Sequence, residues 1–369
     1  MQNNPLVGYQ DEWTVHAISL PRLLDRMNDK VRLAHKLSNP KTWEIEGERL
    51  KFDAIVGNPP YQLPDGGNKS SAIPIYQMFV SQAIEINPQY ISMIMPAKWY
   101  SGGRNLDSFR AMMLKDNRIS TLHDFSDSNE CFEGVDIAGG LCYFLWDRDY
   151  NGDCTVVNHH NGEISSTVRN LNTDEIFVRN GKALPIIAKV KEQDKHFYSE
   201  RVSAQRPFGL RTYVTPTQEG DITLRYSKGR GPYKWKLVTS GLEWIDKWKV
   251  IMSYLTYDHA GRADKNGQRR IFSTMEVLNP GEVCTETYIV IDAFDTEAEA
   301  KNLLKYLKTR FARFLVSQVT TTQHLSKGSF ALVPIQAFTK PWTDAELYAK
   351  YNLTAEEVAF IEAMIKPME

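Results

Sequence analysis

One stretch of ten residues, FDAIVGNPPY at positions 52–61, constrains the fold of this chain more than any other. Its apolar run at 54–56 has no helical spacing and is followed at once by a glycine, as is typical of a short buried strand. The two prolines that come next cannot donate a backbone hydrogen bond, so the strand must end before them. We therefore expect Asn58 and Tyr61 to lie in a stiff turn at the carboxyl end of a strand, where open α/β sheets bind their ligands.

The residues of this turn suit the handling of a flat, conjugated amine. Such an amine is a poor nucleophile because its lone pair is delocalised. The side-chain oxygen of Asn58 and the carbonyl oxygen of Pro59 are acceptors that could take its two N–H bonds and direct the lone pair toward an electrophile. Tyr61 offers a flat face on which an extruded base could stack. The alternative is an ordinary Pro-Pro turn with a capping Asn and a packed Tyr.

The sequence Asn58-Pro59-Pro60-Tyr61 after a buried strand resembles motif IV of the adenine-N6 DNA methyltransferases. The likeness is greatest to the gamma (TaqI-like) enzymes of restriction–modification systems, in which catalytic and target-recognition domains share one chain. The resemblance implies a site-specific enzyme that transfers a methyl group from S-adenosylmethionine to a flipped adenine in double-stranded DNA. It makes the four residues catalytic, with Tyr61 and Phe132 stacked on the two faces of the base. For Phe132 the alternative is an ordinary core aromatic.

The segment before the turn lacks what such an enzyme normally uses to bind its cofactor. A Gly-rich strand–turn–helix lets the backbone approach S-adenosylmethionine closely, but between residues 1 and 53 only the isolated Gly8 and Gly47 occur. The family's acidic residue on the preceding strand is also missing from residues 33–37. The sequence therefore predicts catalytic and recognition portions without the cofactor-binding front, and it leaves the cofactor-binding residues unidentified.

Two other functions stay open. A non-catalytic DNA-recognition fragment or subunit, which needs a second chain for the cofactor half, is favoured by the missing Gly-rich segment, whereas the intact turn favours the enzyme. A related Asn-Pro-Pro-Tyr turn also serves the methylation of glutamine amides. A large basic domain with interspersed aromatic residues argues against that substrate.

The distribution of charge indicates DNA as a partner, although the net charge of the 369 residues is only −1. Residues 201–270 contain 14 Lys and Arg against 6 Asp and Glu, a local surplus of +8. Lys and Arg neutralise phosphates, and Arg can also read base edges. The candidate DNA-binding residues are Lys228, Arg230, Lys234, Trp235, Arg262, Lys265, Arg269 and Arg270. The alternative is a set of solvated, charged loops.

The predicted fold is α/β, in three parts. Residues 1–152 form a partial Rossmann-like methyltransferase domain, the second half of a doubly wound sheet, and residues 153–340 a mixed α/β target-recognition domain. A helical extension at 341–369 should pack back on the catalytic portion. Strands are expected at residues 31–37, 54–56, 90–95, 119–125, 140–146, 155–158, 212–216, 250–254 and 286–291. Helices are expected at residues 15–27, 74–86, 106–114, 296–317, 343–351 and 354–365.

Several other classes of protein are not expected. The four cysteines show no metal-type pairing and the histidines lack zinc-type spacing, so we expect reduced thiols and no metal. No apolar run approaches the ~20 residues that cross a bilayer, and the amino terminus has no signal-peptide pattern. We therefore expect a cytoplasmic protein without a membrane segment. We also find no cluster typical of a fused nuclease.

Overall fold

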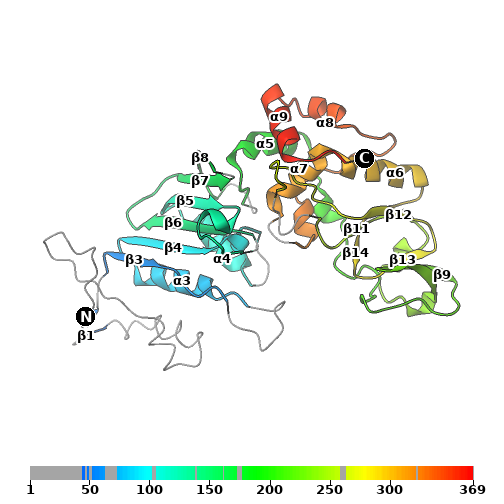
Figure 1. Cartoon of the computed structure of the whole chain (residues 1–369), viewed down its shortest axis with the longest axis horizontal. Helices are drawn as coiled ribbons and strands as arrows, with labels where there is room; N and C mark the ends of the chain where they lie inside the picture. Colours follow the sequence, from blue (N-terminus) through cyan, green and yellow to red (C-terminus); the bar gives the residue numbers. More distant parts are fainter. Residues whose placement is uncertain are drawn as a thin grey trace.

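Figure 1 presents the computed structural model of the chain, a mixed α/β protein in which an N-terminal and a C-terminal part lie side by side. The structure describes residues 44–45, 48–49, 52–62, 73–101, 105–137, 139–160, 162–172, 177–257, 263–320 and 323–368. The expected helix at 15–27 and strand at 31–37 lie outside these residues. Within the described residues, no helix is both long and apolar enough to cross a membrane.

A six-stranded mixed sheet forms the N-terminal part, with the strand order β3-β4-β6-β5-β7-β8. β3 is parallel to β4 and β5 to β7, whereas β6 runs antiparallel between β4 and β5, and β8 runs antiparallel to β7. The strands are β3 (Ala54–Gly57), β4 (Tyr90–Pro96), β5 (Ile119–Phe125), β6 (Leu141–Asp147), β7 (Cys154–His160) and β8 (Glu163–Arg169). Upstream, β1 (Glu44–Ile45) and β2 (Glu48–Arg49) form a separate antiparallel pair. The mixed α/β prediction is confirmed, and the first five strands of the large sheet match the expected ones in position. The expectation that the strand at 54–56 is buried is wrong, because β3 lies at the edge of the described sheet and Val56 is 78% exposed.

Two helices cover one face of the large sheet. They are α3 (Tyr76–Ile86) and α4 (Asp107–Lys115), close to the helices expected at 74–86 and 106–114. Their apolar sides pack with alternate residues of the strands into one buried cluster that includes Val80, Phe109 and Trp146. Because a shift of one residue would turn these strand residues to solvent, the core fixes the register of the sheet.

The opposite face of the sheet carries no helix among the described residues. Strand pairing places Val56, Leu145 and Val168 in one row across this face. Val56 is 78% exposed and Val168 67% exposed. Ser92, Thr121 and Thr155 complete the row, so exposed apolar side chains are separated by small polar ones across this face.

The division between the two parts lies later than the sequence suggests. The expected boundary at 152 puts β7 and β8 in the recognition domain, yet β7 is hydrogen-bonded to β5 and extends the N-terminal sheet. Asn151-Gly152-Asp153 makes only the connection between β6 and β7. Phe177 still belongs to the N-terminal core, whereas Val178 belongs to the C-terminal core. We therefore propose a boundary at about residue 178 in place of 152.

The C-terminal part combines two three-stranded sheets, ordered β12-β11-β14 and β10-β9-β13, with helices α5 to α9. Its strands are β9 (Ile222–Tyr226), β10 (Gly229–Tyr233), β11 (Trp248–Ser253), β12 (Met275–Leu278), β13 (Glu282–Cys284) and β14 (Tyr288–Phe294). Its helices are α5 (Leu184–Gln193), α6 (Glu297–Lys308), α7 (Arg310–Val319), α8 (Asp344–Lys350) and α9 (Ala355–Met364). β11 and β14 correspond to expected strands. The strand expected at 212–216 is wrong, because a turn closed by the Val214 N–H and the Arg211 carbonyl (3.1 Å) occupies this segment.

The single helix expected at 296–317 is wrong, because the chain breaks at Thr309 into α6 and α7. Thr309 has the non-helical angles φ −59° and ψ 149°. Its hydroxyl oxygen accepts a hydrogen bond from the Ala312 N–H at 3.1 Å and caps the start of α7. The Asp344 carboxylate accepts from the N–H groups of Arg310 and Phe311 at 3.1 and 2.9 Å. These acceptors satisfy N–H groups that an unbroken helix would have bonded internally.

The two C-terminal helices begin at capping boxes that start at Thr343 and Thr354, as the sequence predicts. Their expected packing on the catalytic portion is wrong. Apolar residues of α8 and α9 join the core around α6 and α7. Lys350 and the Tyr351 hydroxyl also bond to Asp194, which follows α5, at 2.9 and 2.7 Å. The extension therefore belongs to the C-terminal part.

Candidate active site and DNA-binding surface

The Asn58-Pro-Pro-Tyr61 turn follows β3 at the carboxyl end of the parallel pair β3–β4, where the sequence predicts it. Asn58 is exposed, Pro59 is buried and Tyr61 is half-buried. The Tyr61 carbonyl accepts a hydrogen bond from the Ile75 N–H at 3.1 Å, just before α3. The turn is therefore anchored on both sides, and it presents the Asn58 side chain to solvent.

The side chains of Asn58 and Tyr61 are hydrogen-bonded to each other. Burial, and then the nearby thiols of Cys131 and Cys142, raise the pKa of the Tyr61 phenol to about 12, and the bond with Asn58 acts in the opposite direction. Tyr61 is therefore neutral at pH 7.

The loop that carries Phe132 lies beside this turn. Cys131, its neighbour in the chain, is close enough to Tyr61 to raise the pKa of the phenol. Phe132 keeps 37% of its surface exposed, more than a core aromatic would. The structure thus brings the two predicted stacking residues to neighbouring segments, and their stacking on a base stays a prediction.

A buried serine organises the loop of Phe132. The Ser128 hydroxyl donates to the Val135 carbonyl at 2.6 Å and accepts from the Ile137 N–H at 2.9 Å. Ser128 is only 1% exposed, so these bonds are shielded from water. One side chain therefore closes a loop of ten residues that contains Phe132, whose N–H donates to the Ser128 carbonyl at 2.8 Å.

Arg179 anchors the base of the same loop from the connection between the two parts. Its guanidinium donates to the Asp124 carboxylate at 2.6 and 2.9 Å, and to the carbonyls of Gly139 and Phe125 at 2.8 and 3.1 Å. Gly140 has φ +77°, and a Cβ there would lie 2.0 Å from the Phe125 carbonyl oxygen, so only glycine fits. Sequence reasoning missed this network. The only indication of this network in the sequence was the acidic residue Asp124, near the end of the strand expected at 119–125.

The described residues do not identify which side chains would hold S-adenosylmethionine. Gly57 ends β3 with open space beside its Cα, which leaves room for a ligand. The described segment after the neighbouring strand β4, residues 97–101, contains no acidic side chain, and Gly102-Gly103, which follow directly, lie outside the described residues. β3 is also an edge strand of the described sheet, so no second strand end adjoins the turn on its other side.

Four of the predicted DNA-binding residues are exposed in turns. Lys228 lies in the turn between β9 and β10, Lys234 and Trp235 follow β10, and Lys265 lies in the turn at 264–267. Trp235 is 47% exposed, and the Asp221 carboxylate holds its turn by accepting the Trp235 N–H at 2.8 Å. None of the three lysines forms an ion pair with another residue that the structure describes.

Acidic residues beyond position 270 neutralise part of the charge surplus of the basic stretch. Arg230 is ion-paired with both Glu276 and Glu282, so its guanidinium is engaged within the fold. Other cations of the stretch are paired as well: Arg201–Asp292, Arg206–Glu286, Arg211–Glu286, Arg225–Glu276 and Lys247–Asp295. The charge available to a phosphate backbone is therefore smaller than the sequence count suggests.

Arg269 and Arg270 both contact other residues of the C-terminal part. Arg269 donates to the Ser317 carbonyl at 3.3 Å. The guanidinium carbon of Arg270 lies 4.5 Å from the centre of the Tyr257 ring, in a cation–π stack. Arg262 lies outside the described residues.

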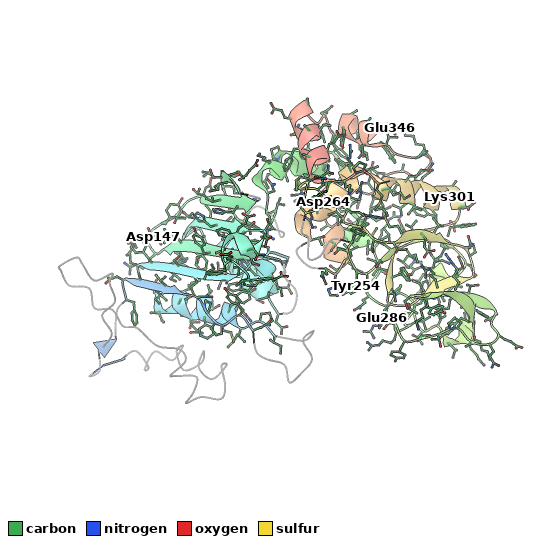
Figure 2. All side chains as sticks on the ribbon, viewed as in Figure 1. Asp147, Tyr254, Asp264, Glu286, Lys301 and Glu346 are labelled. Carbon is green, nitrogen blue, oxygen red and sulfur yellow. The ribbon has the colours of Figure 1, made fainter. Side chains whose placement is uncertain are left out.

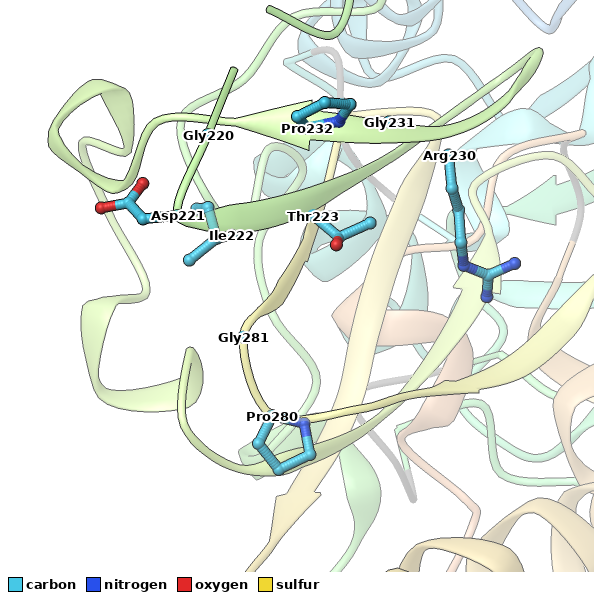
Figure 3. Close-up of a pocket in the computed structure, with 9 residues that line it drawn as sticks. All are labelled: Gly220, Asp221, Ile222, Thr223, Arg230, Gly231, Pro232, Pro280 and Gly281. Carbon is cyan, nitrogen blue, oxygen red and sulfur yellow. The ribbon is translucent and has the colours of Figure 1, made fainter.

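A hollow of about 510 Å³ lies on the C-terminal part. None of the residues that line it belongs to the Asn58 turn. Figure 3 shows it between the β9–β10 hairpin and the turn before β13, with Asp221 at one end and Arg230 at the other. Its lining is Gly220, Asp221, Ile222, Thr223, Arg230, Gly231, Pro232, Pro280 and Gly281. Arg230 is ion-paired and the Asp221 carboxylate accepts the Trp235 N–H, so both charged groups of the lining are engaged within the fold, and we do not assign an active site here.

Comparison with known proteins identifies relatives for the first third of the chain. Residues 6–132 match the family model described as Eco57I restriction-modification methylase. A Mycoplasma pneumoniae (strain ATCC 29342 / M129 / Subtype 1) protein described as an uncharacterized adenine-specific methylase is 40% identical over 147 residues, which cover 35% of this chain and 34% of that protein. The chain thus spans about a third of the length of this curated relative.

Similarity to solved structures is more remote. The type IIL restriction-modification enzyme MmeI, in complex with DNA, aligns with a TM-score of 0.43 and 12% identity, covering 85% of this chain and 52% of that chain. The type IIG restriction endonuclease BpuSI aligns with a TM-score of 0.33 and 11% identity, covering 94% and 48%. A type I restriction-modification methyltransferase subunit from Streptococcus thermophilus aligns with a TM-score of 0.26 and 14% identity, covering 36% and 32%. These alignments are too weak to locate a site.

None of these relatives distinguishes a gamma-type methyltransferase from the other types. The assignment to the gamma type therefore stays a prediction. The family match includes the Asn58 turn and ends at Phe132, so both candidate base-binding segments lie within it. The resemblance to restriction–modification adenine methylases is therefore confirmed as a similarity of residues 6–132 to methylases of the Eco57I restriction-modification type.

Proposed function

We propose that this chain methylates the N6 amine of adenine at specific sequences in double-stranded DNA, as the modification activity of a restriction–modification system. One observation carries the proposal: an exposed Asn58 follows a parallel strand and lies beside a neutral, half-buried Tyr61. The family match over residues 6–132 and the adenine-specific methylase relative support the choice of adenine. The expected donor is S-adenosylmethionine, which supplies an electrophilic methyl group when bound.

The residues of the turn act on the amine by orienting it. The Asn58 side-chain oxygen and the Pro59 carbonyl accept the two N–H bonds of the adenine amine and hold its lone pair toward the donor. The hydrogen bond between the side chains of Asn58 and Tyr61 restricts rotation of the amide. Placing the two reacting groups in line supplies most of the rate, and no strong base is required.

Two aromatic residues hold the flipped base between them. Tyr61 stacks on one face, and because its phenol is neutral it adds no charge next to the amine. Phe132, in the loop closed by Ser128, stacks on the other face. Each stacked aromatic contributes about 1–3 kcal/mol to holding an unpaired base.

Exposed cations of the C-terminal part hold the duplex. Lys228, Lys234 and Lys265 contact phosphates, since each is exposed and lies in a turn that can approach the backbone. Trp235 lies between two lysines and adds a flat apolar contact at the same surface. The ion-paired Arg230 stabilises the hairpin that presents these residues.

Incorporation of a labelled methyl group into unmethylated genomic DNA tests the catalytic role of the turn. We expect Asn58→Ala to lower the initial rate by at least about 100-fold, because one of the two amine acceptors is lost. Asn172→Ala, which removes an exposed asparagine far along the chain, serves as the matched control. Equal rates for Asn58→Ala and the control would exclude the proposed role of Asn58.

A second candidate is a recognition subunit that needs another chain for the cofactor half. Among the described residues it is favoured by β3, which lies at the edge of the sheet and on which Val56 is 78% exposed. Calorimetric titration with S-adenosylmethionine, with and without DNA, separates the two candidates. Micromolar binding favours the complete enzyme, whereas no binding combined with salt-sensitive DNA binding favours the subunit.

A further inference from the structure

We propose that Arg206, Arg211 and Tyr213, oriented by Glu286, read base edges and determine which DNA sequence the protein selects. We call these four residues the Arg–Tyr patch. The inference rests on the proposed function, and it assigns sequence readout to residues other than the exposed lysines, which contact phosphates. None of the four was a sequence-based candidate for DNA binding.

One carboxylate joins the two arginines of the patch. Nε of Arg206 lies 3.4 Å, and Nη1 of Arg211 4.0 Å, from the same oxygen, Oε2 of Glu286. The other oxygen, Oε1, accepts a hydrogen bond from the Thr212 N–H at 3.1 Å. The Glu286 side chain is only 11% exposed, so it supports the arginines from the interior. Because a single carboxylate faces two guanidinium groups, the patch keeps a net positive charge.

The groups that would meet a ligand are at the surface. The side chains of Arg206 and Arg211 are 44% and 51% exposed, and neither donates a hydrogen bond to another residue that the structure describes. Tyr213 is 79% exposed, more than any other large apolar residue in the described part of the chain. Arginine and tyrosine are among the residue types that most often anchor binding interfaces. The patch therefore combines free donors with a flat apolar ring.

The turn that carries Arg206 is held in a strained conformation. Arg206 has φ +66°, which residues other than glycine rarely adopt. The Gly209 N–H closes the turn by donating to the Arg206 carbonyl at 3.1 Å. Phe208 is fully buried in the core, and the Ser240 hydroxyl donates to the Pro207 carbonyl at 3.0 Å. The turn thus packs inward at 207–208 and leaves the Arg206 side chain outside, in a fixed geometry of the kind that function can require.

The turn that carries Tyr213 is fixed to the same glutamate. The Val214 N–H donates to the Arg211 carbonyl at 3.1 Å, and the Glu286 N–H donates to the Leu210 carbonyl at 2.8 Å. Val214 packs against the core, whereas Tyr213 projects into solvent. The backbone of the patch is therefore in place before any ligand binds, as specific recognition requires.

The chemistry of the patch suits base edges better than phosphates. A guanidinium held beside a carboxylate presents its outer N–H groups as a fixed fork, which matches the two acceptors of guanine in the major groove. An aromatic ring offers little to a phosphate but can pack on the methyl group of thymine. Figure 2 labels Glu286 at the edge of the C-terminal part nearer the N-terminal part, which carries the Asn58 turn.

Selection from a pool of random duplexes tests the patch without knowledge of the target sequence. The full chain is mixed with the pool, bound duplexes are sequenced, and the preferred sequence is compared among wild type, Arg206→Lys and Arg211→Lys. Because lysine keeps the charge but lacks the fork, we expect each variant to lose preference at one or two base pairs, with discrimination there falling about 5- to 150-fold. The salt dependence of binding should match that of wild type.

Glu286→Gln separates orientation of the arginines from a merely structural role. Glutamine keeps an acceptor for the Thr212 N–H but removes the negative charge. We expect discrimination to fall at the base pairs read by Arg206 and Arg211, while affinity for the other duplexes rises because the patch becomes more positive. A structural role alone would lower the affinity for all duplexes alike.

Arg148→Lys is the matched control for the lysine variants. Arg148 is 42% exposed and pairs with one carboxylate, that of Asp149, at 3.3 Å. Its N–H donates to the Gln89 carbonyl just before β4, at the end of the sheet opposite the Asn58 turn, so this variant should keep the wild-type preference.

The proposal is overturned if Arg206→Lys and Arg211→Lys keep the full wild-type preference, since both arginines would then be phosphate contacts. It is also overturned if wild type binds all duplexes equally. Failure of wild type to bind any duplex would instead contradict the proposed function itself.

Discussion

Replacing Arg179 with Met removes the ion pair that anchors the base of the Phe132 loop. The Asp124 side chain is buried, and the guanidinium provides two of its hydrogen bonds, at 2.6 and 2.9 Å. After the substitution Asp124 keeps the Asn158 amide, at 3.3 Å, as a donor. The carbonyls of Gly139 and Phe125 lose a donor as well. Leaving a buried charge uncompensated costs about 3–5 kcal/mol, so we expect a loss of that size in the free energy of unfolding.

Urea denaturation followed by tryptophan fluorescence measures this loss, because Trp99 and Trp146 lie in the same core. The matched control is the double variant Asp124→Asn with Arg179→Met, which removes both charges and should recover at least about 1 kcal/mol. Hydrogen exchange reports on the loop: the Ile137 N–H, which bonds to Ser128, should exchange faster in Arg179→Met. A loss below about 1 kcal/mol in the single variant would refute the reasoning that this pair holds the loop.

Four further predictions follow from single side chains. Because the pKa of Tyr61 is raised to about 12, the difference in ultraviolet absorbance between wild type and Tyr61→Phe should show no phenol ionisation below about pH 10. Burial lowers the pKa of Lys249 to about 8, so the unfolded state binds more protons than the folded state between about pH 8 and 10.5. The free energy of unfolding of wild type, relative to that of Lys249→Met, should therefore rise with pH across this window. In urea titrations we expect a rise of at most about 1.4 kcal/mol per pH unit. Lys228→Ala and Lys234→Ala should each reduce the slope of log affinity against log salt by about 0.9 in anisotropy measurements, whereas unchanged slopes would exclude phosphate contacts. Thr309→Ala should lower the thermal stability by about 0.5–2 kcal/mol through loss of the cap on α7, and no change would contradict that role.

Five strands of the N-terminal sheet, β3 to β7, could be predicted from the sequence because they are short runs rich in apolar residues, and the Asn58 turn follows directly from the two prolines after β3. β8 could not be predicted in this way, since its sequence EISSTVR is largely polar. The break at Thr309 could not be predicted in this way, since residues 296–317 have continuous helical spacing. What ends α6 is a cap completed by Asp344, which lies more than thirty residues farther along the chain.

The candidate site was predictable only where it is local in sequence. Asn58 and Tyr61 are neighbours along the chain, but the anchoring of the Phe132 loop depends on Arg179, which comes from the connection between the two parts. The charge surplus of the basic stretch was likewise overestimated, because Glu276 and Glu282 approach Arg230 only through the pairing of β9 with β10 and β13. The anchoring of the Phe132 loop and the pairing of Arg230 depend on contacts between segments far apart in the chain. The spacing of apolar residues along the sequence contains no information about such contacts.

The most direct test of the proposed function is the identity of the methylated nucleoside. Unmethylated genomic DNA is incubated with the full chain and S-adenosylmethionine, digested to nucleosides and analysed by mass spectrometry. We predict that the DNA treated with wild type contains N6-methyladenine and no methylated cytosine. DNA treated with Asn58→Ala should contain no N6-methyladenine. Binding of both S-adenosylmethionine and DNA without formation of N6-methyladenine would contradict the role assigned to the Asn58 turn.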